Sequence, residues 1–308
     1  MNSLCRTILG RPFTRWLLCS LMAWLLAGPC LAAETTVRVL CWNVRNYLIT
    51  DRRVEGVWRE DYPKPEVEKA VLRAVIQKYD PDILALQEMG AQPFLLEFQR
   101  DLRSAGLEYP HSILMQADDS VRHTAVLSKL PFAATAPVRK MPFNYFGETV
   151  NPLRGCLEVI FETEETRWSL VNLHLKSRWT DDTRDDESRL RRTREAEVIR
   201  NHLRAKYPIG GGYPLLIVGD FNDHPNSGVL DRFYDIGQTP LFPPIMATDS
   251  RGHLWTYYWA RQQSYQRVDF LLGTPALHTH VQTAFVVDTP EPLDASDHRP
   301  LVLDLKFD

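Results

Sequence analysis

The stretch "LLIVGDFNDHP", residues 215–225, decides the fold of this chain. It begins with four apolar residues, and a continuous apolar run of this kind predicts a strand that is buried on both faces. The run enters Gly219, and polar residues follow within five positions: Asp220, Asn222, Asp223 and His224. Polar groups at the end of such a strand either cap a turn or face a functional site.

Composition places the chain among soluble globular proteins. Its 308 residues are 44% hydrophobic and 24% charged, which is ordinary and allows a large core. No internal repeat, low-complexity block or linker rich in Pro, Gly and Ser divides it. We expect one domain over residues 34–308.

The N-terminus has the three-part pattern of a secretory signal peptide. Its first fifteen residues contain three bases and no acid, namely Arg6, Arg11 and Arg15. An apolar run of thirteen residues follows at 16–28, and small residues suit cleavage after Ala32 or Ala33. A retained anchor or a buried helix are the alternatives, but the run is short for a membrane span. Residues 1–33 therefore predict export to the periplasm or the medium, with no stable membrane span after cleavage.

Charge and cysteines narrow the function only a little. The formal net charge is −3, and loss of the three signal arginines would lower it to −6. This is not the charge of a tight, non-specific DNA binder. A nuclease stays open, because metal ions can supply positive charge locally. Cys41 and Cys156 remain after cleavage and could pair in an oxidising compartment, or could simply be buried. The cysteine spacing matches no metal site.

Hydrophobic periodicity predicts strands alternating with helices, then a strand-rich end. The expected strands are 36–44, 82–88, 123–129, 157–162, 168–176, 215–220 and 298–307, with two more around a polar turn in 253–273. The expected helices are 65–79, 94–106 and 186–207. Alternation in 298–307 predicts one buried and one solvent-facing side.

Several of these strands end in polar residues of catalytic type. They are Asn43; Gln87 and Glu88; Asn172, His174 and Lys176; Asp220 and Asn222; Asp269; and Asp297 with His298. In "VNLHLK" the period of two puts Asn172, His174 and Lys176 on one side and the apolar residues on the other. Each residue alone fits a turn or a strand end. Together, at the ends of at least five strands, they predict a site. Asp223, His224 and Pro225 are assigned to the turn.

Six motifs in order resemble the endonuclease/exonuclease/phosphatase superfamily, which includes deoxyribonuclease I, abasic-site endonucleases, neutral sphingomyelinases and inositol-polyphosphate phosphatases. They span residues 42–301 and read "WNVRNY", "LQEM", "NLHLKS", "VGDFND", "RVDFLL" and "SDHRPL". The resemblance implies an α/β fold, a four-layered sandwich of two packed mixed β-sheets flanked by helices. The elements expected above fit that architecture in one domain.

The resemblance also implies metal ligands. Glu88 resembles the principal Mg²⁺ ligand, Asn43 its near neighbour, and Asp297 a residue close to the metal. Mg²⁺ is a hard ion that prefers carboxylate and amide oxygens and water, which these three side chains offer. Mn²⁺ or Ca²⁺ would also suit such ligands. Whether one or two metal ions are used stays open.

The same resemblance assigns the remaining roles. Asp220 and Asn222 resemble the pair that orients the attacking water and holds the phosphate. His174 resembles a histidine that assists the leaving group or binds phosphate, Asp269 the carboxylate that orients this chemistry, and His298 a base or phosphate ligand. Phosphodiester hydrolysis needs a cation, an oriented water and a proton donor for the departing oxygen, so the residue types suit the reaction.

Further residues are candidates for substrate contact. Asn172 is assigned to the substrate phosphate. Arg154 precedes a strand as a phosphate-contacting arginine does in relatives, although a surface arginine is the alternative. Arg178 and Trp179 follow "NLHLKS" and could contact substrate. The charged stretch 184–194 is expected to form a solvated helix with intrahelical ion pairs. The aromatic residues Trp255, Tyr257 and Trp259 are expected in the core.

The sequence thus predicts an exported, Mg²⁺-dependent phosphoesterase that hydrolyses a phosphodiester. Nucleic acid, DNA or RNA, is the leading substrate. A lipid or small-molecule phosphodiesterase or phosphatase is the main alternative, and would need an exposed apolar patch beside the site, for which 141–146 is the candidate. A non-catalytic binding module on the same fold is a third. No protein partner is indicated.

Overall fold

The computed structural model describes residues 35–180 and 182–307. The predicted signal peptide, residues 1–33, lies outside the described residues. No helix in the described part of the chain is both long and apolar enough to cross a bilayer.

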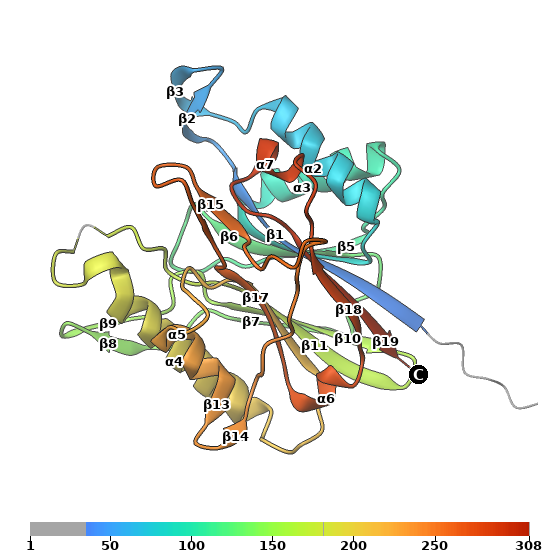
Figure 1. Ribbon diagram of the computed structural model, residues 1–308, viewed down its shortest axis with the longest axis vertical. Helices are drawn as coiled ribbons and strands as arrows, with labels where there is room; N and C mark the ends of the chain where they lie inside the picture. The colour runs from blue at the N-terminus through green and yellow to red at the C-terminus, as the bar shows by residue number, and fades with distance from the viewer. Residues whose placement is uncertain (1–34, 181, 308) are drawn as a thin grey trace, which may run out of the picture. The chain divides into compact units, whose positions relative to one another are not determined.

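Two mixed sheets form the framework (Figure 1). The first has the order β18 (Val281–Val286), β19 (Leu301–Phe307), β1 (Thr35–Tyr47), β4 (Ile83–Met89), β6 (His123–Ser128) and β5 (His111–Leu114). The second has the order β17 (Asp269–Gly273), β12 (Leu215–Asp220), β11 (Thr166–His174), β10 (Cys156–Thr163) and β7 (Ala134–Val138). The pairs β1–β4 and β11–β12 are parallel, and the other neighbours are antiparallel.

Three apolar clusters define four layers. One cluster fills the space between the sheets, with Val39 of β1 and Val159 of β10 among its members. The second joins the outer face of the first sheet to α2 (Glu66–Tyr79) and α3 (Gln92–Ser104). The third joins the outer face of the second sheet to α4 (Arg189–Lys206) and α5 (Gly228–Tyr234). The predicted α/β sandwich of two mixed sheets flanked by helices is confirmed.

Short elements connect this framework. They are the hairpins β2 (Thr50–Val54) with β3 (Val57–Tyr62), β8 (Phe143–Tyr145) with β9 (Glu148–Val150), β13 (Asp235–Ile236) with β14 (Thr239–Pro240) and β15 (Tyr257–Trp259) with β16 (Ser264–Gln266), the 3₁₀ turn η1 (Asp186–Ser188), and the helices α6 (Pro275–His278) and α7 (Pro292–Ala295). The segment 253–273 therefore holds three strands and not two.

Gly219 allows β11 and β12 to approach each other. Its φ of 142° lies in a region that favours glycine, and a Cβ there would sit 1.9 Å from the carbonyl oxygen of Leu173. Glycine is therefore required for the strand pairing that brings the end of β12 beside the end of β11.

Three expectations about side chains were wrong. Both faces of β19 are buried, because Val302 packs under the helices and Asp304 binds Arg38 at 2.7 and 2.9 Å. The stretch 184–194 is not simply solvated, because Arg192 is buried and forms an ion pair of 2.9 Å with Asp223. Asp223 is thus more than a turn residue.

The two cysteines in the described residues, Cys41 and Cys156, are buried and free. They lie in different apolar clusters, Cys41 between the sheets and Cys156 under α4. The disulfide that an oxidising compartment would have allowed is absent from the structure, and the burial alternative holds.

Candidate active site

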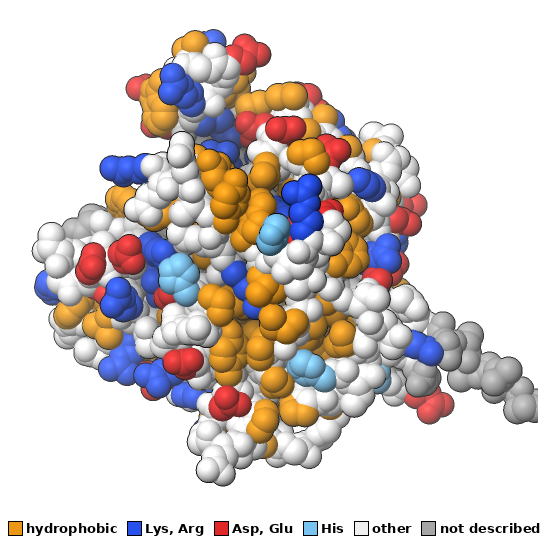
Figure 2. All heavy atoms as spheres, viewed as in Figure 1, with side chains coloured by type: hydrophobic (Ala, Val, Ile, Leu, Met, Phe, Trp, Pro, Cys, Tyr) orange, Lys and Arg blue, Asp and Glu red, His pale blue; other side chains and the backbone are white. Residues whose placement is uncertain are grey.

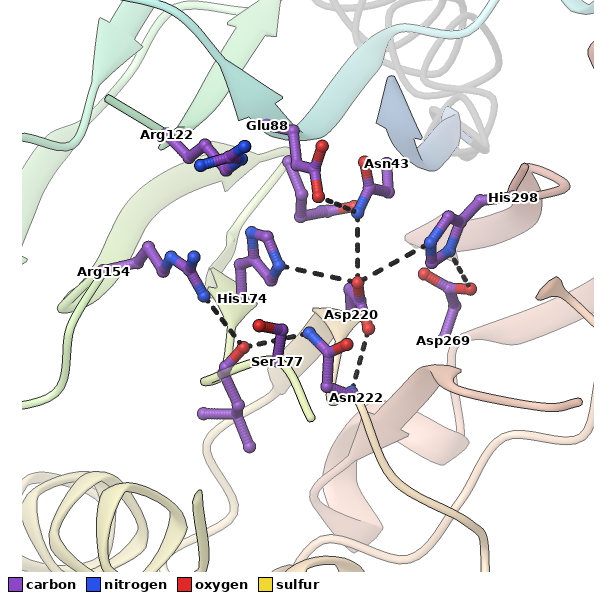
Figure 3. A network of polar contacts seen from close by, with 12 residues as sticks. Asn43, Glu88, Arg122, Arg154, His174, Ser177, Asp220, Asn222, Asp269 and His298 are labelled. Carbon is purple, nitrogen blue, oxygen red and sulfur yellow. Dashed lines mark hydrogen bonds and ion pairs between the residues drawn. The ribbon is translucent and has the colours of Figure 1, made fainter. Parts of the chain in front are cut away.

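Asp220, the last residue of β12, lies at the centre of a network of polar side chains (Figure 3). Its Oδ2 accepts a hydrogen bond of 3.0 Å from the amide of Asn43. Its Oδ1 accepts one of 2.8 Å from the backbone N–H of Asn222. The Nε2 atoms of His174 and His298 lie 3.6 and 3.8 Å from Oδ2. Four residues predicted for the site thus surround the carboxylate of a fifth, Asp220.

Strand register explains why these residues converge. In the second sheet His174 is paired with Asp220, and Asp220 is paired with Asp269 of the next strand. The polar side of β11 faces the first sheet, because its apolar residues Val171 and Leu173 pack under the helices of the outer layer. Residues from strands that are distant in sequence therefore reach the same edge.

Glu88 is held by an irregularity at the end of β4. Its φ is 60°, an unusual conformation for a non-glycine residue and a frequent sign of a functional constraint. The β4 pairings on both sides shift register close to this position. The Oε1 atom accepts a hydrogen bond of 3.3 Å from the amide of Asn43, and Oε2 accepts one of 2.9 Å from the backbone N–H of Asn46.

His298 and Asp269 form a buried pair. The Nδ1 atom of His298 lies 2.9 Å from Oδ2 of Asp269, and the imidazole lies against the ring of Tyr257 with centroids 4.8 Å apart. Burial alone would lower the pKa of His298, but the carboxylates of Asp269 and Asp220 outweigh it and raise this pKa to about 10. The imidazole is therefore protonated at neutral pH in the metal-free protein.

The other two titratable groups behave differently. Burial raises the pKa of Asp220 to about 7, against the opposing attraction of His298. Burial, and then the positive charge of Arg154, hold the pKa of His174 well below its ordinary value. His174 is therefore neutral, and its Nδ1 is buried without a hydrogen-bond partner among the described residues. The two histidines, both predicted for the site, lie on either side of Asp220, and His174 is neutral where His298 is protonated.

Asn222 follows Asp220 in a left-handed conformation, with φ of 55°. One amide hydrogen is used in a bond of 3.0 Å to the carbonyl of Leu175. The other hydrogen and the amide oxygen remain for a ligand, and the side chain lines the cavity described next.

A cavity of about 320 Å³ opens onto this network. Its polar floor contains Glu88, Asp220, Asn222, Asp297 and His298, and its walls include Arg45, Ser177, Arg178, Trp179, Tyr257, Trp259 and Gln266. Arg178 and Trp179 therefore lie where substrate contact was expected. Tyr257 and Trp259 are half-buried cavity walls and not core, and Trp255 packs instead on the guanidinium of Arg299 at 4.1 Å.

Two residues predicted to contact phosphate lie elsewhere. Asn172 is fully buried between the sheets. Its amide nitrogen donates hydrogen bonds of 3.0 and 2.9 Å to the carbonyls of Leu86 and Ala125. Its amide oxygen accepts a hydrogen bond of 2.7 Å from Gln87. It joins the two sheets and has no place in the cavity lining, so the predicted phosphate contact does not fit the structure.

Arg154 is not the surface arginine of the alternative. It is buried and donates to Asp119 at 2.9 Å and to the carbonyl of Leu175 at 3.2 Å. It lies on the far side of His174 from the centre of the network, as Figure 3 shows, and it is not part of the cavity lining. Its positive charge acts on His174, and the predicted phosphate contact stays a prediction.

Two of the three predicted metal ligands are at the floor of the cavity. Glu88 and Asp297 both line it, with Asp297 3.8 Å from the guanidinium of Arg45. The amide nitrogen of Asn43 donates to Glu88, and its amide oxygen accepts a hydrogen bond of 2.9 Å from the backbone N–H of Arg45. Asn43 therefore orients Glu88 and Asp220 in this conformation. Its side-chain oxygen is bound to the backbone of Arg45 and is not presented to a metal ion beside Glu88.

A second cluster can also be considered as a metal site. One ligand atom each from Asp220, Asp269 and His298 lie within 4.8 Å of one another, and Oδ1 of Asp269 is buried without a partner among the described residues. His298 and Asp269 are already paired, however, and the imidazole is protonated. The open, oxygen-only pair of Glu88 and Asp297 fits a hard divalent cation better.

Some residues of the site were missed by sequence reasoning. Asn46 positions Glu88 through its backbone, and its side-chain oxygen accepts 2.8 Å from Arg122. Gln266 lines the cavity. Asn46 lies inside "WNVRNY" and could have been suspected from that motif. Arg122 and Gln266 carry no signal in the sequence, because only the folded chain brings them to the site.

The chain belongs to the Endonuclease/Exonuclease/phosphatase family, since the sequence model of that family matches residues 40–298. The predicted family is confirmed. Members of this family are hydrolases that act on phosphoester bonds, so the prediction of a hydrolase acting on ester bonds is confirmed too. The family generally depends on a divalent metal ion.

Solved structures agree with the fold. The human Nocturnin catalytic domain with bound sulfate has 20% identity and a TM-score of 0.61, covering 87% of this chain and 93% of its own. The endonuclease/exonuclease/phosphatase from Bacteroides vulgatus has 18% identity and a TM-score of 0.62, covering 89% of this chain and 100% of its own. Sphingomyelinase C from Streptomyces griseocarneus has 14% identity and a TM-score of 0.57, covering 88% of this chain and 99% of its own. No curated protein sequence matches the chain. Identities this low support the fold alone.

Proposed function

We propose that the protein is an exported, Mg²⁺-dependent phosphodiesterase with nucleic acid as its leading substrate. The observation that carries the proposal is the network in which the buried carboxylate of Asp220 lies between the side chains of His174 and His298, with Asp220 and His298 at the floor of an open cavity.

Glu88 and Asp297 would hold the metal ion at the floor of the cavity. A bound Mg²⁺ would neutralise charge on the phosphate oxygens. Asp220 has a pKa near neutrality, which suits a group that orients a water molecule and takes its proton. Asn222 has one amide hydrogen free for a phosphate oxygen.

The two histidines would then have separate tasks. Protonated His298, held by Asp269, can donate to a phosphate oxygen and supplies positive charge beside it. Neutral His174 can donate or accept one hydrogen bond on the other side of Asp220. The amide nitrogen of Asn43 donates to both Glu88 and Asp220 and so orients the two carboxylates.

The cavity walls favour a nucleotide. Arg45 and Arg178 attract phosphate oxygens and repel a cationic head group such as choline. Trp179, which is 72% exposed, and Trp259 offer flat apolar surfaces on which a base can stack. Nocturnin and sphingomyelinase C share the fold, so the fold by itself does not select among substrates.

Exposed apolar side chains on the hairpin β2–β3, and not the patch predicted at 141–146, favour the lipid alternative. The candidate patch at 141–146 is mostly buried, with Phe146 its one exposed large apolar side chain. The hairpin β2–β3, however, extends away from the sheets in Figure 1, and Val57 and Trp58 on it are 52% and 63% exposed. A lipid phosphodiesterase could use such side chains to reach a membrane surface.

The substrate can be tested with a panel of phosphoesters. The purified protein would be assayed with Mg²⁺ against DNA, RNA, bis-p-nitrophenyl phosphate, sphingomyelin and inositol phosphates. Hydrolysis of nucleic acid, lost with EDTA, is expected. Turnover of sphingomyelin alone, reduced by Trp58→Ala, would favour the lipid alternative. No turnover of any substrate would contradict the proposal.

Export rests on the sequence of residues 1–33 and needs its own test. We propose cleavage after Ala32 or Ala33, so the protein recovered from the periplasm or medium of a bacterial host should begin at Ala33 or Glu34. Intact Met1 on protein that stays with the cytoplasm or membrane would contradict export and cleavage.

A further inference from the structure

A second hollow lies directly beside the candidate active site, and we call it the side hollow. Its volume is about 360 Å³. The residues that matter in its lining are Arg178, Arg189, Arg192, Asp223, His224 and Ser227. Arg178 also lines the active-site cavity, so the two spaces meet at its side chain. A ligand in the active site can therefore extend past Arg178 into the side hollow.

Arg178 is held in place by neutral partners. Its Nη2 lies 2.9 Å from Nε2 of His224, and its Nε lies 3.4 Å from the carbonyl oxygen of Asn222. Within residues 35–180 and 182–307, no carboxylate forms an ion pair with Arg178 or with Arg189. Both guanidinium groups therefore keep their full positive charge for a ligand.

The other charged residues that line the side hollow are one base and two acids. Arg192 is neutralised by Asp223 through contacts of 2.9 and 3.0 Å. Glu187 is the other carboxylate in the lining. Two unpaired arginines against one carboxylate leave the space positive, and Figure 2 shows several Lys and Arg side chains, with Asp and Glu side chains among them, over the part of this face where Figure 1 draws α4 and α5.

Neutral donors complete the lining. Arg178 donates to Nε2 of His224, so the proton of this neutral imidazole sits on Nδ1 and can be donated to a ligand. Ser227 accepts a bond from the backbone N–H of Leu230 and keeps its own hydroxyl hydrogen free. Guanidinium, imidazole and hydroxyl donors around one space suit a group with several acceptor oxygens, and phosphate is such a group.

We infer that the side hollow binds a second phosphate of the substrate, next to the phosphate that is hydrolysed. The inference rests on the proposed function, because it places the first phosphate in the active-site cavity. It makes the preferred substrate one with at least two phosphates. The neighbouring phosphate of a nucleic-acid strand and a phosphorylated inositol head group share this chemistry.

Calorimetry on the purified protein with Mg²⁺ can test the second phosphate. The ligand pairs are thymidine 5′-monophosphate with thymidine 3′,5′-bisphosphate, and inositol 1-phosphate with inositol 1,4-bisphosphate, their integrity checked by chromatography. Binding of the bisphosphate at least about tenfold tighter than the monophosphate is expected, as for charge-assisted hydrogen bonds. A gain in the thymidine pair indicates a strand, and a gain in the inositol pair alone indicates the head group. Equal affinities within both pairs would overturn the inference.

Variants locate the effect. Arg189 lines the side hollow but not the active-site cavity, so Arg189→Gln should lower the ratio of bisphosphate to monophosphate affinity. Arg194→Gln is the matched control, because Arg194 lies on the same helix and pairs with Glu197 at 2.9 Å outside the hollow. A ratio unchanged by both Arg189→Gln and Arg178→Gln would overturn the inference. Failure of the proposed function would appear separately, as absent hydrolysis of phosphodiesters.

Discussion

Asp220 and His298 show how burial sets charge at the level of single residues. Both side chains are almost fully buried, and each faces the other across 3.8 Å. His298 keeps its proton because Asp269 binds the opposite nitrogen of its ring at 2.9 Å. Asp269 is therefore the residue that decides the charge of the imidazole.

Replacing Asp269 with Asn should lower the pKa of His298 toward its ordinary value of 6.5, because the charge of the nearest carboxylate is lost. NMR titration of the His298 ring in EDTA would measure this. The raised pKa stabilises the folded protein fully below about pH 6.5 and loses this effect as the pH rises through about 10. The variant should thus be less stable than wild type at pH 6, by a margin that shrinks toward pH 10. Equal titration curves would refute this account of the pair.

Asn172 distinguishes a structural residue from a phosphate ligand. Asn172→Ala should lower the free energy of unfolding by about 2–4 kcal/mol, because it leaves buried partners on two strands of the first sheet without a hydrogen bond. Urea unfolding would measure the loss. KM of the folded variant for a phosphodiester should match wild type, and a large rise in KM with unchanged stability would restore the phosphate role.

The sequence allowed some of these side chains to be predicted, for a physical reason. His174, Asp220 and Asp269 stand at the paired ends of β11, β12 and β17, whereas Asn43 lies within β1 and His298 precedes β19. Asn172 has the same period-two signal as His174. Only the packing of the first sheet against β11 shows that Asn172 is enclosed between the sheets and that His174 reaches the network around Asp220.

At the scale of elements, Gly219 controls how β11 and β12 meet. Gly219→Ala should cost at least about 4 kcal/mol or prevent folding, because the new Cβ would overlap the carbonyl of Leu173 at 1.9 Å and φ is unfavourable. Thermal unfolding followed by circular dichroism would measure this. Gly228→Ala is the control: no atom lies within 4 Å of its Cβ position, and its stability should stay within about 1 kcal/mol of wild type. A stable Gly219→Ala protein would contradict the strand geometry.

Helix α4 shows what element patterns leave out. Its alternating charges predict exposed intrahelical pairs, and Arg194 with Glu197 is one of these. Arg192 and Glu195 have the same charges but are buried, Glu195 accepting from the backbone N–H groups of Leu153 and Lys176. Charge spacing on a helix does not indicate which loops fold over it, so these contacts could not be predicted.

At the scale of the whole molecule, the layer order could be predicted and the cavity could not. Apolar runs and helical spacing predict most of the strands and helices of the sandwich, but they miss β5, β7, β18 and α5, and the four layers were implied by the family resemblance. The cavity walls come from the short hairpin β15–β16, which contributes Tyr257 and Trp259, and from the loop after β11, where Trp179 has no periodic signal. Aromatic alternation is the same in a core strand and in a cavity wall, which is why Tyr257 and Trp259 were misplaced.

The central claim is that Glu88 holds a divalent ion that this fold uses to hydrolyse a phosphodiester. The most direct measurement is the rate of bis-p-nitrophenyl phosphate hydrolysis against Mg²⁺ concentration for wild type, Glu88→Gln and Glu162→Gln, the last an exposed carboxylate on β10. Wild type and Glu162→Gln should lose activity in EDTA and regain it with Mg²⁺, whereas Glu88→Gln should fall at least about 100-fold with unchanged thermal stability. A folded Glu88→Gln protein with the full Mg²⁺-dependent rate would contradict the claim.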